Sequence, residues 1–162
     1  MPTNPEQLVQ KLSTALLDAG CRVCTAESCT GGLIAKTITD LAGSSDWFER
    51  GFVTYSNAAK SEMLAVPPTV IEDYGAVSEP VAAAMASGAL RHSHADYAIA
   101  VTGVAGPGGG SAEKPVGSVW IAVASSEQLI SKLFQFDGDR AAVRDATLNA
   151  ALELLLDMMN SG

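Results

Sequence analysis

A single junction near the N-terminus limits how this chain can fold. Residues 22–26 form an apolar run, residues 33–41 carry apolar side chains at helical spacing, and only ESCTGG (27–32) lies between them. So short a connection is typical of a buried strand that turns directly into a helix in an α/β protein. The start of such a helix leaves backbone N–H groups free, and Ser28 and Thr30 add side-chain oxygens there. The junction therefore predicts a site for an anion or a tetrahedral intermediate, although a plain helix start with Thr30 as N-cap explains the same residues.

The rest of the chain continues the alternation of helices and strands. Hydrophobic periodicity and the intervening breaks predict helices at 5–19, 32–41, 57–64, 69–74 and 78–91, a last one opened by 137–139, and strands at 21–26, 47–55, 97–102, 116–125 and 128–136. The last two strands are joined by Ser126 and Glu127 alone, and so short a connection requires an antiparallel pair. We therefore expect one domain over residues 1–162, with an α/β fold of three α/β/α layers and a mixed, mostly parallel sheet.

Composition argues against several classes of partner. With 162 residues, 48% of them hydrophobic, the chain has enough apolar material for its own core. Its net charge of −8 argues against a nucleic-acid or anionic-membrane surface, whereas a small phosphorylated ligand needs only one or two cations. The first ten residues do not resemble a secretory leader, and no stretch is apolar for long enough to span a bilayer. Three cysteines crowded into one segment favour a reducing compartment, so we expect a cytoplasmic protein.

The residue types that bind metals do not form a convincing set. Cys21 and Cys24 have C-x-x-C spacing, but they open a strand whose alternation sends the two thiols to opposite faces, and a second pair is missing. His92, His94 and Asp96 fall where a helix runs into a strand, and the sequence suggests no fourth ligand. We therefore expect core packing for the cysteines, a solvated connection for the histidines, and neither a metal nor a cofactor.

A second group of polar residues is expected at the end of strand 47–55. Tyr55 lies at this end, and the helix that follows begins with Asn57 and carries Lys60 about one turn in. Tyr55 and Lys60 can therefore face one cleft. The structural alternative for Lys60 is a solvated side chain on an exposed helix face.

A glycine-rich loop follows the predicted central strand. Residues 97–102 form a continuous apolar run, and GVAGPGGG (103–110) follows it directly. The loop lacks the GK[ST] ending of a P-loop and leads into a strand, so neither common nucleotide-binding fingerprint applies. Ligands of open α/β sheets lie beyond the carboxyl ends of the strands, and there Ser28 and Gly103 would share one edge. The loop is either a mobile lid or a spacer.

Five segments in this order resemble the CinA C-terminal domain family, and most closely its stand-alone nicotinamide-nucleotide amidases. They are AESCTGGLIA (26–35), GFVTYSN (51–57), YGAVSEPV (74–81), TGVAGPGG (102–109) and KPVG (114–117), and the resemblance covers essentially the whole chain. It implies a serine amidohydrolase that converts nicotinamide mononucleotide and water to nicotinate mononucleotide and ammonia, in pyridine-nucleotide salvage.

The resemblance also implies roles for individual residues. Ser28 matches the nucleophile, Lys60 the base, and Tyr55 a supporting hydroxyl that relays or holds the proton between them. Elementary chemistry agrees, because a serine needs a base, the two histidines are weak candidates, and a lysine can act once its pKa falls toward neutrality. The amides around residues 30–32 are expected to stabilise the oxyanion. The residues expected to bind the nucleotide are Thr30, Gly31, Gly32, Asn57, Thr102, Gly103, Gly106, Arg140 and Arg144, with the two arginines at its phosphate.

Two other functions stay open on the sequence. Cys29 is a candidate nucleophile of a thiol amidase, because a cysteine at a helix N-terminus has a lowered pKa. Alternatively, the domain is a nucleotide sensor without catalytic activity, of the kind that a link to competence and damage-inducible proteins suggests. A sensor needs no aligned serine and lysine.

The last helix predicts an assembly of subunits. Residues 150–159 are apolar apart from Glu153 and Asp157, which lie one turn apart and define a narrow polar stripe. The sheet of one chain covers one side of such a helix, so we expect a second subunit on the other side, in a homodimer or a larger homo-oligomer. The alternative is a helix held entirely within one subunit's core, under loop 103–115.

Overall fold

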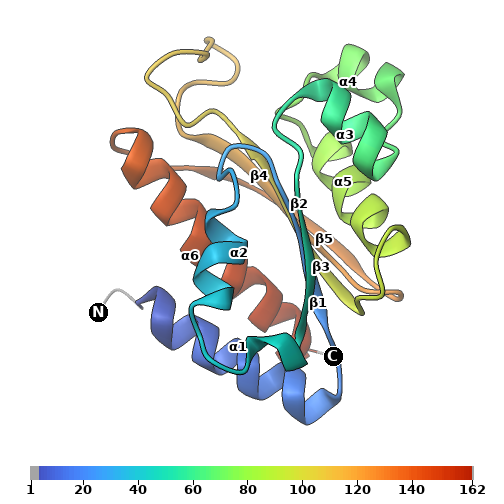
Figure 1. Cartoon of the computed structure of the whole chain (residues 1–162). Helices are drawn as coiled ribbons and strands as arrows, with labels where there is room; N and C mark the ends of the chain where they lie inside the picture. The colour runs from blue at the N-terminus through green and yellow to red at the C-terminus, as the bar shows by residue number, and fades with distance from the viewer. Residues whose placement is uncertain (1–3, 162) are drawn as a thin grey trace.

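Residues 4–161, which the computed structural model describes, form a five-stranded sheet with helices on both faces (Figure 1). In chain order the elements are α1 (Pro5–Ala19), β1 (Val23–Glu27), α2 (Leu33–Thr39), the 3-10 turn η1 (Ser44–Asp46), β2 (Phe48–Val53), α3 (Asn57–Leu64), α4 (Pro68–Tyr74), α5 (Glu79–Arg91), β3 (Tyr97–Gly103), β4 (Ser118–Ala124), β5 (Leu129–Gln135) and α6 (Arg140–Ser161). The predicted α/β fold is confirmed.

The strand order is β2-β1-β3-β4-β5. β1 pairs in parallel with β2 and with β3, whereas β4 is antiparallel to both of its neighbours. Of the described strands, β4 alone therefore runs against the others, and the mixed, mostly parallel sheet is as predicted. The carboxyl ends of β1, β2 and β3 lie together at one edge of the sheet, the edge at which a ligand is expected.

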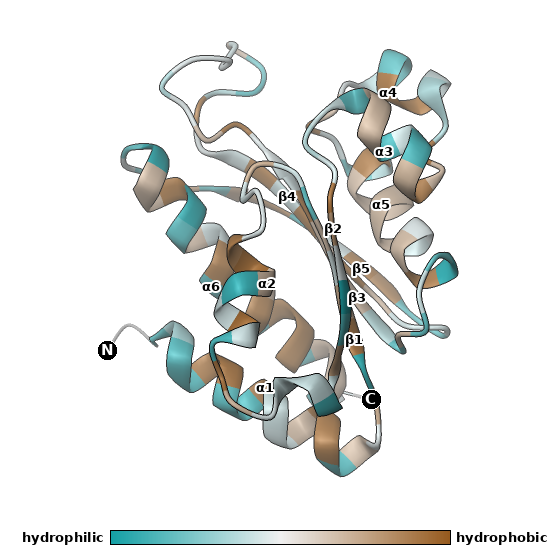
Figure 2. Cartoon of the chain, in the orientation of Figure 1, coloured by the Kyte–Doolittle hydropathy of each residue, from teal (hydrophilic) through white to brown (hydrophobic). Residues whose placement is uncertain are grey.

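Helices cover the two faces of the sheet in two groups, which gives the predicted three layers. α1, α2 and α6 lie on one face, and α3, α4 and α5 lie on the other (Figure 1). Side chains of β1 alternate between the two resulting cores: Val23 joins the core under α1 and α6, and Cys24 joins the core under α5. Cys21 packs against the first core, so the two thiols face opposite sides of the sheet, as predicted. In Figure 2, hydrophobic and hydrophilic bands alternate along α1, as expected for a helix that packs one face on the first core and exposes the other.

Local capping signals fix several helix ends. Asn4 accepts a hydrogen bond from the Gln7 N–H at the start of α1, and Gly20 ends this helix in the left-handed conformation. Ser56 caps α3 and Ser78 caps α5 in the same way, each through its side-chain oxygen. Because these signals are local, the boundaries of α1 and α3 agree with the sequence prediction. None of the helices within residues 4–161 is long and apolar enough to cross a membrane.

The last helix corrects one step of the sequence argument. α6 packs against β3 and β4 of the sheet and against α1, which lies in the same layer (Figure 1). Its buried side chains are Val143, Thr147, Leu148, Ala151, Leu152, Leu155, Leu156 and Met158. The apolar surface of this helix therefore does not by itself require a second subunit, because the sheet and α1 of the same chain already bury much of it. The sequence could not show this, since an apolar helix surface does not identify the element that packs on it.

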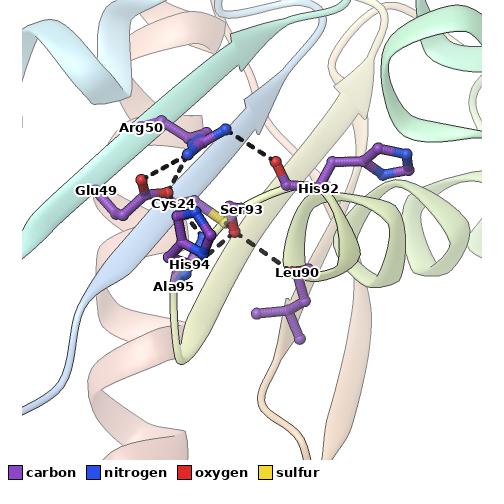
Figure 3. A network of polar contacts seen from close by, with 8 residues as sticks. All are labelled: Cys24, Glu49, Arg50, Leu90, His92, Ser93, His94 and Ala95. Atoms are coloured by element: carbon purple, nitrogen blue, oxygen red, sulfur yellow. Dashed lines mark hydrogen bonds and ion pairs between the residues drawn. The ribbon is translucent and has the colours of Figure 1, made fainter.

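The connection that carries His92 and His94 forms a polar network at the end of the sheet opposite the carboxyl ends of β1, β2 and β3 (Figure 3). Arg50 pairs with the neighbouring Glu49 and donates a hydrogen bond to the His92 carbonyl at 3.1 Å. Glu49 accepts the backbone N–H of His94 at 3.1 Å. These contacts fasten edge strand β2 to the connection between α5 and β3. Across residues 4–161 there is no group of three His, Cys, Asp or Glu side chains placed to hold a metal ion.

Candidate active site

Ser28 and Lys60 meet at the carboxyl edge of the sheet. Ser28 directly follows β1, and Lys60 lies in the first turns of α3, which begins after β2. The Lys60 Nζ is 3.1 Å from the Ser28 Oγ, and only 1% of Lys60 and 7% of Ser28 is exposed. The alternative of a solvated Lys60 is therefore wrong. A buried amine in hydrogen-bond contact with a serine hydroxyl is the arrangement that proton transfer between them requires.

Burial favours the neutral form of this lysine. Desolvation lowers the pKa of Lys60 below its usual value, because the charged form loses its hydration inside the protein. Its amine also contacts the backbone carbonyl of Tyr55 at 3.2 Å. A neutral Lys60 can thus donate one N–H to this carbonyl while its lone pair faces the serine hydroxyl, and the carbonyl also stabilises the ammonium formed after proton transfer.

Tyr55 contributes its backbone to the pair and its side chain to a different contact. Its carbonyl lies 3.4 Å from the Ser28 Oγ, as a second acceptor for the serine proton. Its side chain is 60% exposed, and its hydroxyl accepts a hydrogen bond from the Arg140 Nη2 at 3.1 Å. The predicted proton relay through the Tyr55 hydroxyl is therefore wrong. The backbone turn between β2 and α3 points the side chain outward, and a residue name alone does not reveal that direction.

Cys29 does not have the properties of an activated thiol. It is 6% exposed, and burial raises its pKa to about 11, so the thiol stays protonated near neutral pH. The first free amides of α2, those of Ile34 and Ala35, donate to the Glu27 carboxylate and not to the sulfur. The helix N-terminus was the reason for expecting a lowered cysteine pKa, and Glu27 occupies it.

The Ser28–Lys60 pair opens into a cavity of about 240 Å³. Seven of the predicted site residues line it, namely Ser28, Tyr55, Asn57, Lys60, Thr102, Gly103 and Arg140. The remaining lining residues are Cys29, Ala76, Val77 and Ala105. Ala76 and Val77 come from the connection between α4 and α5, which Thr102 holds over the end of β3 by donating to the Ala76 carbonyl at 2.8 Å. Sequence reasoning missed both, although they lie in the YGAVSEPV segment that carries the family resemblance.

Other predicted binding residues serve the architecture around the cavity. Thr30 is fully buried, its hydroxyl donates to Glu27 at 2.6 Å, and its carbonyl accepts from Arg144 at 2.8 Å. Thr30 therefore holds the turn and does not offer its side chain to a substrate. Gly31 and Gly32 have φ values of 58° and 105°, a backbone region that favours glycine, so they form the turn itself.

Arg140 connects this cavity to a second one. Arg140 and Ala105 line both the small cavity and a neighbouring cavity of about 680 Å³, which Arg144 also lines. Arg140 donates to the Gly106 carbonyl at 2.8 Å as well as to Tyr55. Gly106 thus anchors the glycine-rich loop to α6.

Comparison with known proteins identifies the family. The family model of the CinA C-terminal domain matches residues 5–159. The chain belongs to the CinA C-terminal domain family. This confirms the resemblance carried by the five sequence segments.

Similar proteins cover nearly all of this CinA domain. It is 54% identical over 150 residues to the nicotinamide-nucleotide amidohydrolase PncC of Escherichia coli strain K12, covering 92% of this chain and 91% of the relative. It is 52% identical over 151 residues to the nicotinamide-nucleotide amidohydrolase PncC of Pseudomonas putida, covering 93% and 94%. The crystal structure of the competence/damage inducible protein CihA from Agrobacterium tumefaciens superposes with a TM-score of 0.94 at 47% identity, over 99% of this chain and 98% of that one.

The glycine-rich loop of this CinA domain is fastened to helices on both faces of the sheet. Lys114 donates to the Tyr74 carbonyl at the end of α4 at 2.8 Å, and Arg140 holds Gly106 from α6. The loop is therefore more than a spacer, because it ties together elements from the two faces of the sheet.

Proposed function

We propose that this chain is a nicotinamide-nucleotide amidohydrolase, which converts nicotinamide mononucleotide and water to nicotinate mononucleotide and ammonia by a serine-lysine mechanism. The observation that carries the proposal is the buried Lys60 amine 3.1 Å from the Ser28 hydroxyl, with both residues lining one cavity. The relatives named nicotinamide-nucleotide amidohydrolases support the substrate class. A nucleotide sensor without catalytic activity does not require a buried lysine aligned with a serine hydroxyl.

The proposed reaction has two halves. In the first, neutral Lys60 takes the proton of Ser28, and the Oγ attacks the carboxamide carbon to form a tetrahedral intermediate. The C–N bond then breaks, the Lys60 ammonium returns its proton to the leaving nitrogen, and ammonia departs from an acyl ester on Ser28. In the second half, Lys60 takes a proton from water, the hydroxide attacks the ester, and nicotinate mononucleotide leaves as Ser28 recovers its proton.

The oxyanion of the tetrahedral intermediate needs N–H donors near Ser28. The Gly31 amide already donates to the Ser28 carbonyl at 3.0 Å. Of the amides expected for this role, those of Thr30 and Gly32 therefore remain the candidates. Such donors typically contribute about 3 to 4 kcal/mol to the stabilisation of a transition state.

Each of the two cavities binds a different part of the substrate. The carboxamide must reach Ser28 in the smaller cavity, and the larger cavity beyond Arg140 then receives the ribose phosphate. Arg140 and Arg144 both line this larger cavity, so a phosphate there meets two guanidinium groups. The chain as a whole is acidic, and this local pair of cations is what a single phosphate needs.

Ammonia release from three amides tests this proposal. We expect turnover with nicotinamide mononucleotide, in the presence of EDTA, and much weaker activity with nicotinamide riboside or nicotinamide, which lack the phosphate. Arg140→Ala is expected to raise KM for the nucleotide roughly 10- to 100-fold and to change KM for the riboside little, because one charged contact is lost. Lys132→Ala, on β5, is the control for loss of one positive charge. Binding of the nucleotide without any ammonia release would favour a sensor.

A homodimer or larger homo-oligomer remains part of the proposal, with a different surface as its support. Leu129 and Leu133 are exposed on β5, an edge strand of the sheet. Light scattering checks the assembly, since a mass near 16.7 kDa at micromolar concentration indicates a monomer.

A cytoplasmic location also stays a proposal, supported by the free thiols of Cys21, Cys24 and Cys29.

A further inference from the structure

We propose that Glu27 is a positioning residue, which holds the Ser28 turn in its reactive geometry without touching the substrate. The inference rests on the proposed serine mechanism. Glu27 is the last residue of β1, immediately before Ser28, and is only 1% exposed. A carboxylate buried this deeply is costly unless its oxygens are well hydrogen-bonded, so its partners indicate its role.

Within residues 4–161, each hydrogen bond of this carboxylate goes to the turn or to the helix that follows it. One oxygen accepts the Thr30 hydroxyl at 2.6 Å and the Ile34 N–H at 2.8 Å, and the other accepts the Ala35 N–H at 3.0 Å. Gly32, at the N-cap position of α2, has no side chain with which to bind these amides. Glu27 therefore does the work of a capping residue from outside the helix, and its negative charge suits the positive end of α2.

The catalytic serine lies between groups that are fixed on both sides. Before it, the Glu27 carbonyl accepts the Thr54 N–H of the chain leaving β2 at 2.9 Å. The Ser28 N–H itself donates to the Val101 carbonyl of β3 at 3.1 Å. After it, Thr30 is held by the Glu27 carboxylate through its hydroxyl and by Arg144 through its carbonyl. The carboxylate thus joins the strand before Ser28 to the helix after it, across a turn of five residues, 28–32.

This role differs from acid-base chemistry. The oxygens of Glu27 face Thr30 and α2, whereas the Lys60 amine faces Ser28 and the Tyr55 carbonyl. Burial is the main cause of the lowered pKa of Lys60. Loss of the Glu27 charge should therefore slow the reaction without moving the pH at which Lys60 becomes active.

Glu27→Gln is the test variant, because it keeps the shape of the side chain and replaces one acceptor oxygen with an NH₂ donor that faces another donor. We expect kcat for ammonia release to fall about 10- to 100-fold, since a displacement of 1 Å at a reacting group can cost that much. KM and the midpoint of the pH profile should stay unchanged. Thr30→Val, which removes the hydroxyl, should lower kcat in the same way, and Thr30→Ser, which keeps it, should recover most of the kcat that Thr30→Val loses.

A double variant and a matched control separate positioning from general loosening. Glu27→Gln combined with Thr30→Val should lose clearly less than the product of the two single losses, because the two residues share one hydrogen bond. Ile38→Val, in the buried face of α2, weakens the packing of this helix without removing a Glu27 contact, and it should keep the wild-type kcat.

Several results would overturn the inference. A wild-type kcat in Glu27→Gln would do so, and so would a pH midpoint that rises toward the usual lysine value, since that signals water reaching Lys60. If Glu27→Gln does not fold, Thr30→Val decides, and a wild-type kcat there overturns the inference. An active Ser28→Ala contradicts the proposed function itself. An inactive Ser28→Ala beside a fully active Glu27→Gln contradicts only the role of Glu27.

Discussion

Ser28→Ala is expected to lower kcat for ammonia release from nicotinamide mononucleotide by at least about a thousandfold, the loss typical of a missing nucleophile. The reason is geometric. The Ser28 Oγ is the hydroxyl in contact with the buried Lys60 amine, and alanine leaves this base without a nucleophile to activate. Substrate binding should survive, because the arginines proposed to hold the phosphate lie on α6.

Cys29→Ala is the matched control for this variant, because Cys29 is adjacent and lines the same cavity. It should keep its activity within a few-fold, since a buried thiol with a pKa of about 11 is a poor nucleophile near neutral pH. Circular dichroism should show the same folded structure for both variants. An inactive Cys29→Ala beside an active Ser28→Ala would transfer the chemistry to the thiol.

Lys60→Arg is expected to be as inactive as Lys60→Ala, with losses of about 100- to 10,000-fold, the usual contribution of a general base. Only the neutral amine can accept the serine proton, and a guanidinium remains charged at any pH at which the protein is folded. In the wild type, kcat/KM should therefore rise as the pH climbs through the Lys60 pKa, which burial holds below its usual value near 10.4. A fully active Lys60→Arg would remove the lysine from the mechanism.

The pH dependence of protein stability tests the lowered pKa of Lys60 independently of activity. At pH values between the lowered pKa of Lys60 in the folded protein and its pKa in the unfolded chain, the unfolded chain binds more protons than the folded protein does. The free energy of unfolding therefore rises with pH across this window, and the buried amine destabilises the fold below it. Lys60→Met removes the amine and should be more stable than the wild type by about 1 kcal/mol at neutral pH, a difference that shrinks toward pH 10. Thermal unfolding at several pH values measures it.

Features with local causes were predictable from the sequence. Gly20 ends α1 and Ser78 starts α5 because their chemistry acts within one turn of the chain. Ser28 and Lys60 were expected together because of the family resemblance, and the topology explains why they meet. Both follow strands whose carboxyl ends meet at one edge of the sheet, so topology brings them together.

Features that depend on tertiary packing were not predictable. The sequence places Tyr55 at the site but does not show that its carbonyl, and not its hydroxyl, faces Lys60. The apolar surface of α6 predicted a covering element, and only the structure identifies that element as α1. Glu27 did leave a signal, since a carboxylate at the end of a buried strand needs hydrogen-bond partners. Its partner Thr30 lies three residues away, which fits a structural role better than the substrate contact predicted for that threonine.

The proposed serine mechanism depends on an acyl intermediate on Ser28, which mass spectrometry of acid-quenched protein can detect. Wild-type protein is mixed with nicotinamide mononucleotide, quenched within the first turnovers, digested, and the peptide containing Ser28 and Cys29 is fragmented. We expect a nicotinate-mononucleotide acyl group on Ser28, absent from Ser28→Ala and removed as the carboxylate product appears. An acyl group on Cys29 or on another residue would contradict the serine mechanism. Release of ammonia by Ser28→Ala at the wild-type rate, without any acyl group on the protein, would contradict it as well.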